Sequence, residues 1–242
     1  MWSSRVLARW MASVALILAL SACLPAATPT PTPTATPSPT ARELLDRAAD
    51  ALRGLESVRF ELTHEEGGTQ MGGGFLVTAV EGQAVFPDRA ALDAHAVSST
   101  FGIAVDLGIV QIGSQAYLQD PLSGTWRVVD LSELPFLFAG VNVSVADALV
   151  DAVEVTFVGT RDLDGVPVFA LKATVSTEVL KELVPSAQVG ERLSVEVLMG
   201  QEDGLVRSFR LEGALLVQDT PGMVRVLRLS EFNAAITIEP PL

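Results

Sequence analysis

The stretch VEVTFVGTRDLDGVPVFALKATVS, residues 153–176, decides the fold class of this 242-residue chain. Apolar side chains alternate at Val153, Val155 and Phe157, and the alternation resumes from Phe169 to Val175. Asp164-Gly165, between the two runs, is a dipeptide typical of a β-hairpin turn. The stretch therefore predicts two long antiparallel strands, each with one face towards a hydrophobic core.

The same alternation recurs on both sides of this hairpin. It predicts further strands at Val58–Leu62, Phe75–Ala79, Phe101–Leu107, around residues 116–118 and 126–128, at Leu193–Val197, at Phe209–Leu211 and at Val224–Ile238. A slip of phase near Ser230-Glu231 predicts a bulge in the last strand.

Three short helices are expected beside the strands. Thr40 and Glu43 have the spacing of a capping box, and apolar residues follow at helical intervals over Leu44–Leu55. Ser176–Val184 predicts a second helix, and Ser144 is the expected N-cap of a third. Long strands with few helices indicate an α+β domain, in which a strongly curved antiparallel sheet, a half-barrel, has helices covering its concave face.

The N-terminus has the pattern of an exported lipoprotein. Arg5 and Arg9 precede an apolar run, Met11–Leu20, that is too short to span a bilayer. The run ends in Leu20-Ser21-Ala22-Cys23, which resembles the bacterial lipobox and contains the only cysteine of the chain. We expect residues 1–22 to be a signal peptide and Cys23 to carry an acyl anchor. An ordinary secretory cleavage beside a coincidental cysteine is the alternative.

The rest of the chain divides into a tether and one domain. Residues 23–40 are rich in Pro and Thr, a composition that favours an extended polyproline II tether. Residues 41–242 are long enough for a single domain with a substantial core. Removal of residues 1–22 leaves 14 basic against 29 acidic side chains, which argues against nucleic acid as a partner. We therefore expect an extracytoplasmic monomer held at the cell membrane by its acyl anchor.

No recognisable catalytic motif accompanies these elements. His64 and His95 are the only histidine candidates for a general base, and no Gly-x-Ser-x-Gly elbow exists to pair with them. Asp162–Gly165 resembles the start of a calcium loop, but Ala173 stands where an EF-hand requires a bidentate glutamate. We expect no enzyme, no cofactor and no metal site.

Several short motifs together resemble the LppX/LprAFG lipoprotein family, within the broader LolA/LolB-like group of lipid carriers. The similarity covers Arg42–Pro241, and its most specific parts are Gly113–Tyr117, Trp126, Val145–Leu149, Gly159–Val168, Ser176–Leu180, Leu229–Phe232 and Ile238–Pro241. The resemblance implies a half-barrel that encloses an apolar cavity for acylated lipids or glycolipids. The segment Leu131–Gly140 departs from the family pattern, so the resemblance does not locate the portal.

The inward positions of the predicted strands are the expected lining of this cavity. They are Phe60, Leu62, Phe75, Val77, Ile103, Val105, Leu107, Val155, Phe157, Phe169, Leu171 and Phe209. We expect no polar side chain among them to hold a small metabolite. The apolar block Leu134, Phe136, Leu137 and Phe138 is either the lip of the cavity or a buried plug, and periodicity does not separate the two.

The expected function is to bind an acylated lipid or glycolipid and to carry or present it at the cell envelope. Two other classes remain open. A sensor of the same fold would use the cavity to regulate an envelope protein partner, and a structural lipoprotein would fill the cavity with its own side chains.

Overall fold

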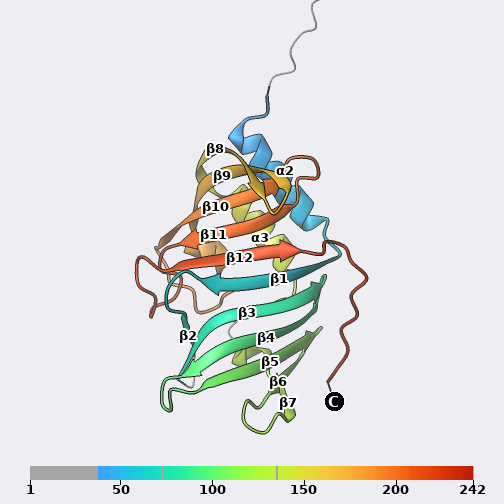
Figure 1. The fold of residues 1–242 in the computed structure, drawn as a ribbon, viewed down its shortest axis with the longest axis vertical. Coiled ribbons are helices and arrows are strands. Elements are labelled where there is room, and N and C mark those ends of the chain that lie inside the picture. Colours follow the sequence, from blue (N-terminus) through green and yellow to red (C-terminus); the bar gives the residue numbers. More distant parts are fainter. Residues whose placement is uncertain (1–37, 72–73, 135, 242) are drawn as a thin grey trace, which may run out of the picture. The chain divides into compact units, whose positions relative to one another are not determined.

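The computed structural model describes residues 38–71, 74–134 and 136–241 (Figure 1). The expected signal peptide, Cys23 and nearly all of the expected tether lie outside the described residues. Pro39–Leu242 form one compact unit. Among the described residues, no helix combines the length and the apolar character needed to cross a membrane.

Twelve strands of the described chain form one antiparallel sheet. They are β1 (Ser57–His64), β2 (Thr69–Met71), β3 (Phe75–Val85), β4 (Arg89–Ser98), β5 (Ala104–Ile112), β6 (Gln115–Gln119), β7 (Trp126–Val129), β8 (Val153–Leu163), β9 (Val166–Ser176), β10 (Arg192–Gly200), β11 (Val206–Glu212) and β12 (Val224–Ser230). Their order is β7-β6-β5-β4-β3-β1-β12-β11-β10-β9-β8, with β2 paired only to β3. Since β7 and β8, at the two ends of this order, do not pair with each other, the sheet is an open half-barrel.

Helices α2 (Ala41–Arg53) and α3 (Val141–Val150) lie against the β8–β12 half of the sheet (Figure 1). Of the two 3₁₀ turns, η3 (Thr177–Leu180) follows β9 in that half, whereas η2 (Leu131–Glu133) follows β7 and packs through Leu131 against the β3–β7 half. The capping box of α2 is confirmed, because the Thr40 side chain accepts from the Glu43 backbone N–H and the Glu43 carboxylate accepts from the Thr40 N–H. This helix therefore begins where its sequence predicts.

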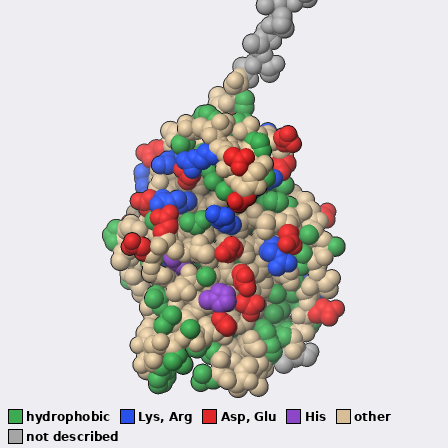
Figure 2. All heavy atoms as spheres, in the orientation of Figure 1, with side chains coloured by type: hydrophobic (Ala, Val, Ile, Leu, Met, Phe, Trp, Pro, Cys, Tyr) green, Lys and Arg blue, Asp and Glu red, His purple; other side chains and the backbone are tan. Residues whose placement is uncertain are grey.

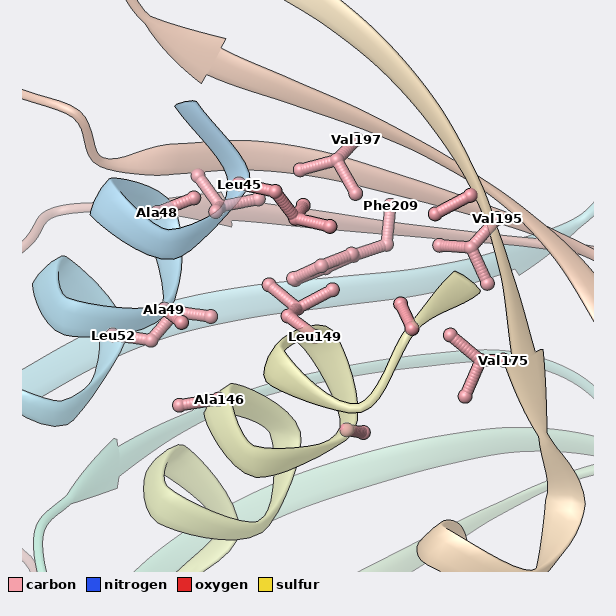
Figure 3. Close-up of a cluster of buried hydrophobic side chains, with 14 of the residues drawn as sticks. Leu45, Ala48, Ala49, Leu52, Ala146, Leu149, Val175, Val195, Val197 and Phe209 are labelled. Carbon is pink, nitrogen blue, oxygen red and sulfur yellow. The ribbon is translucent and has the colours of Figure 1, made fainter. Parts of the chain in front are cut away.

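Small residues let the two helices approach each other over the sheet. Ala48 and Ala49 of α2 and Ala146 of α3 are fully buried, and they belong to the same cluster as Val197 and Phe209 of the strands (Figure 3). Close packing of this kind leaves little free volume. The β8–β12 half of the domain therefore has a solid core.

Four local expectations were wrong. The helix expected over Ser176–Val184 is only the 3₁₀ turn η3, Thr177–Leu180. The last strand ends at Ser230 and does not reach Ile238, because Glu231 and Asn233 adopt positive φ angles of 49° and 55°. Helix α3 begins after Gly140, which adopts a left-handed conformation and takes the N-cap position expected for Ser144. Strand β5 begins only at Ala104, so Ile103 belongs to the preceding turn.

Candidate functional site

The middle of the concave face forms the floor of an apolar cavity. One cross-strand row runs from Phe209 through Leu227, Leu62 and Val80 to Ala94. All five residues line the cavity. A neighbouring row adds side chains from the same strands and from β5, namely Leu229, Phe60, Leu92 and Ile109. The floor thus spans β11, β12, β1, β3, β4 and β5.

The opposite wall comes from the helices and from a plug segment, residues 134 and 136–138. Leu52 near the end of α2 and Val145 of α3 line the cavity from the helical side, and Leu134, Phe136 and Phe138 line it from the plug segment. The ring of Phe138 stacks on that of Phe60, with centroids 6.3 Å apart. The plug segment therefore contacts the strand floor directly.

Backbone hydrogen bonds hold the plug segment in place. The Leu137 N–H donates to the Leu183 carbonyl over 3.0 Å. The Phe138 N–H donates to the Oε1 atom of Gln111, a fully buried side chain of β5, over 3.2 Å. Because a buried amide needs partners on both of its polar atoms, Gln111 also donates from Nε2 to the Gly113 carbonyl.

The cavity has a volume of about 230 Å³, and its lining includes two polar residues, Arg225 and Asn142, whose polar atoms contribute almost none of its surface. This corrects the expectation that the concave face carries no polar residue. Arg225 shares a face with Leu227 and Leu229 because side chains two positions apart on a strand point the same way. Asn142 belongs to the first turn of α3.

The guanidinium of Arg225 is engaged in a buried polar network beside the cavity. It donates to Asp219 Oδ2 over 2.7 Å and to Thr69 Oγ1 over 3.1 Å. Only 8% of the Arg225 side chain and 1% of the Asp219 side chain are exposed. The same Asp219 oxygen accepts the backbone N–H groups of Leu215 and Leu216, so this ion pair fixes the loop that brings Leu215 to the cavity wall.

His64 extends this network on the side of β2. Its Nδ1 lies 2.9 Å from the Thr78 carbonyl, which can only accept, so in the neutral ring Nε2 accepts from the Thr69 hydroxyl over 2.8 Å. Burial lowers the pKa of His64 below its ordinary value, the Thr78 hydrogen bond opposes this shift, and the charge of Arg225 supports it. The structure therefore favours a neutral histidine with a structural role.

The expected site residues divide into two groups. Phe60, Leu62 and Phe209 line the cavity, as do Leu134, Phe136 and Phe138, whereas Leu137 contributes the backbone hydrogen bond described above. The other expected lining residues lie away from it. Leu171 is part of the solid core under the helices, and Val155 and Phe169 pack at the edge of that core. A second group packs together beyond the cavity, namely Phe75, Val77, Val105 and Leu107. Ile103 and Phe157 are half-exposed.

Sequence reasoning missed two kinds of cavity residue. Small side chains such as Ala84 and Ala94 line the cavity because they leave volume above the sheet, and a search for large apolar residues passes over them. The alternation of Ala90, Leu92, Ala94 and Ala96 is visible in the sequence and could have placed β4. Helix residues such as Leu52 carry no signal that distinguishes a cavity from a core.

The outer face of the sheet carries many charged side chains. Charged side chains are scattered over it (Figure 2), including ion pairs between Arg59 and Glu231 at 3.1 Å and between Arg161 and Glu196 at 2.7 Å. A hollow of about 770 Å³ on this face is walled partly by charged residues such as Glu61 and Arg228. Charged walls do not remove hydrocarbon from water, so the concave cavity is the candidate site for an apolar ligand.

The described domain is an open half-barrel with an apolar cavity between its sheet and its helices. The chain belongs to the LppX/LprAFG lipoprotein family, because the family model described as LppX_LprAFG lipoprotein matches residues 40–238. This membership confirms the resemblance read from the short motifs. No curated protein matches the chain significantly in sequence.

Two mycobacterial structures share the fold. LprF from Mycobacterium bovis is 17% identical with a TM-score of 0.64, over 85% of this chain and 99% of that one. LppX from Mycobacterium tuberculosis is 17% identical with a TM-score of 0.57, over 82% and 98%. A LolA superfamily protein from Nitrosomonas europaea is 12% identical with a TM-score of 0.29, over 81% and 93%. The half-barrel fold class expected from the sequence is confirmed.

Proposed function

We propose that this protein is a membrane-anchored lipoprotein that binds the acyl chain of a lipid or glycolipid in its concave cavity and carries or presents it at the cell envelope. The observation that carries the proposal is the lining of the cavity. Leucine, isoleucine, valine, alanine and phenylalanine side chains from six strands, the helices and the plug segment surround it. Each methylene buried against such a lining contributes about 0.8 kcal/mol, so an acyl chain gains affinity without any specific polar contact.

The size of the cavity bears on the kind of cargo. Its volume of about 230 Å³ lies somewhat below the roughly 300–1,000 Å³ typical of small-molecule sites. One acyl chain, or part of one, matches this volume better than a two-chain lipid. A larger lipid would require Phe136 and Phe138 to move outward, which costs the hydrogen bonds of Leu137 and Phe138 described above.

The anchor of the proposed lipoprotein is Cys23, at the end of its lipobox-like tetrapeptide. Two or three acyl chains hold a protein durably at a membrane, whereas one chain does so only marginally. Anchoring at Cys23 would keep the domain within a tether's length of a lipid source.

The direct test is co-purified lipid. The full-length protein and its Ala94→Leu variant are purified in parallel from bacterial membranes, extracted with organic solvent and compared by mass spectrometry. The variant fills the cavity floor and leaves the anchor unchanged, so membrane lipid that adheres non-specifically is equal in both. We expect an acyl lipid that is abundant in the parent protein and depleted in the variant. Equal lipid content in the two samples would refute the proposal.

A further inference from the structure

Three large apolar side chains are exposed on loops that lead into or out of the strands. Phe101 is 77% exposed in the β4–β5 turn, Val217 is 78% exposed in the β11–β12 loop, and Val189 is 67% exposed in the connection from η3 to β10. Among the large apolar side chains of the described residues, only Leu122 in the β6–β7 turn is as exposed. Single exposed apolar residues are common, so their arrangement on the sheet decides whether they form a surface.

Strand pairing places these three loops at one end of the sheet. Ser98, at the end of β4, lies opposite Phe75 at the start of β3, and Arg225, at the start of β12, lies opposite His64 at the end of β1. Because β1 and β3 are antiparallel neighbours, both pairs mark the same end. Strand β10 also begins there, since it runs antiparallel to β11. Figure 1 shows the β4–β5 turn and the β11–β12 loop both on the left of the sheet.

The surface formed by these loops carries no exposed charge. We define the end loops as residues 99–103, 185–190 and 213–223. They contain one charged residue, Asp219, whose side chain is 1% exposed and paired with Arg225. In the whole chain, by contrast, 19% of the residues are charged. The end loops can therefore enter the interfacial layer of a bilayer without the cost of desolvating a charge.

Two of the end loops connect this surface to the wall of the cavity. Leu215 of the β11–β12 loop lines the cavity, as does Val184, directly before the loop of residues 185–190. Gln188 joins the two loops, because its backbone N–H donates to the Leu215 carbonyl over 2.8 Å and its Nε2 donates to the Leu216 carbonyl over 2.6 Å. The exposed valines of both loops thus belong to the same hydrogen-bonded unit as part of the cavity wall.

We propose that the end loops insert Phe101, Val189 and Val217 into the interfacial layer of a lipid bilayer, and so hold this end of the cavity against the lipid source. The inference rests on the proposed function, because the acyl anchor and the tether bring the bilayer within reach. The tether between Cys23 and Ala41 spans up to roughly 50 Å in a polyproline II conformation. Three apolar side chains bind a bilayer weakly on their own, but tethering raises the effective concentration to the millimolar range.

A bilayer fits this surface better than a protein does. A stable protein interface buries about 800 Å² on each partner, which is more than three side chains on separate loops supply. Removal of residues 1–22 leaves 14 basic against 29 acidic side chains, so the contact does not depend on anionic lipids. We therefore expect docking on vesicles of neutral phosphatidylcholine.

Site-specific fluorescence tests the contact in the full-length protein. Cys23 is the only cysteine, and its proposed acylation leaves no free thiol, so a cysteine introduced by Val217→Cys or Val189→Cys takes an environment-sensitive label alone. Glu202→Cys, in the β10–β11 turn at the opposite end of the sheet, is the control. In phosphatidylcholine vesicles, we expect the two end-loop labels to shift to shorter emission wavelengths and to lose most of their fluorescence to nitroxide-labelled lipid. The control label should change little.

A second pair of variants tests whether the loops dock as one surface. Phe101→Glu, read out by the label at Val189→Cys on a different loop, should lower the ratio of inserted to free label about tenfold, because a phenylalanine side chain leaves the hydrocarbon. Val158→Glu, at a half-exposed valine of β8 outside the end loops, should leave the label inserted. Phe101 is largely exposed, so its substitution does not disturb the core.

The outcomes separate the inference from the proposed function. End-loop labels that stay in water while an acyl lipid co-purifies with the protein would overturn the inference alone. So would a wavelength shift that appears only at high ratios of protein to lipid, because it would indicate contact between copies of the chain. Absence of acyl lipid from the purified parent protein would overturn the proposed function, and with it the role of docking in lipid uptake.

Discussion

Two alanines on one strand allow a sharp test of whether the concave face encloses usable volume. Ala94 and Ala96 both lie on β4, are almost fully buried and point to the same face. Both belong to the same apolar cluster, but only Ala94 lines the cavity as well. The same substitution to leucine at these two positions therefore adds identical atoms to a cavity and to a packed core.

The expected changes in stability have opposite signs. Ala94→Leu adds three carbon atoms, which at about 0.8 kcal/mol each contribute up to about 2.4 kcal/mol when buried. The side chain loses about 0.5–1 kcal/mol of rotamer entropy, so the net gain is about 1.5 kcal/mol. Ala96→Leu forces the same atoms into a filled space, which costs about 1–3 kcal/mol.

Thermal melts of the delipidated proteins measure both effects. For a domain of this size 1 kcal/mol corresponds to roughly 2–4 °C in Tm, so Ala94→Leu should raise Tm by about 3–6 °C and Ala96→Leu should lower it. Fluorescent fatty acid binding should weaken strongly in Ala94→Leu and stay close to the parent value in Ala96→Leu. If both variants lose stability and neither changes lipid binding, the concave face is simply packed and the cavity has no role in binding.

Three further predictions concern the anchor, the buried ion pair and the histidine. Cys23→Ala should move the protein out of the detergent phase on phase separation, and a correctly trimmed variant that still partitions into detergent would contradict acylation. Asp219→Asn leaves the buried Arg225 without its countercharge and should lower the free energy of unfolding in urea by about 3–5 kcal/mol, whereas Asp50→Asn, at an exposed pair, should cost less than about 1 kcal/mol. The pKa of His64 is lower in the folded than in the unfolded chain. The unfolded state therefore takes up the proton first, and the free energy of unfolding should fall as the pH drops below about 6.5. If the urea midpoint of His64→Gln has the same pH dependence as that of the parent protein, this histidine is not the cause.

Local sequence patterns sufficed for the architecture. The expected hairpin of residues 153–176 is confirmed as β8 and β9, with Asp164-Gly165 at the turn between them, although β8 contains no buried residue and so does not turn a face to the core as expected. The turn requires positive φ angles, which are 53° at Asp164 and 85° at Gly165, and these residue types adopt them at low cost. Strand alternation and helix capping involve residues that are close in sequence, so both patterns can be recognised in the sequence before any tertiary contact is known.

The extent of the cavity depends on contacts that no local pattern encodes. Leu171 and Leu62 have the same alternation signal and lie on the same face of the sheet, yet Leu171 is buried in the solid core and Leu62 lines the cavity. The difference comes from the segment that covers each residue, and that covering segment is distant from the residue in the sequence. Likewise, the alternation that places apolar side chains inward on the last strand also places Arg225 inward. Its ion pair with Asp219 compensates the cost of burying the guanidinium charge.

The position of the cavity follows from the unequal cover of the two halves of the sheet. Over β8–β12, the fully buried alanines of α2 and α3 bring both helices down onto the strands, so side chains from both layers fill the space. Over the β1–β6 half, the cover is the plug segment, with Leu134 and Phe138 packed among strand residues, while the floor includes small residues such as Ala84 and Ala94. A short segment above alanines supplies less volume than two helices above valines and leucines. Free volume therefore collects at the boundary between the two covers, where Phe60, Leu62 and Phe209 meet, and this is the place at which an acyl chain would complete the core.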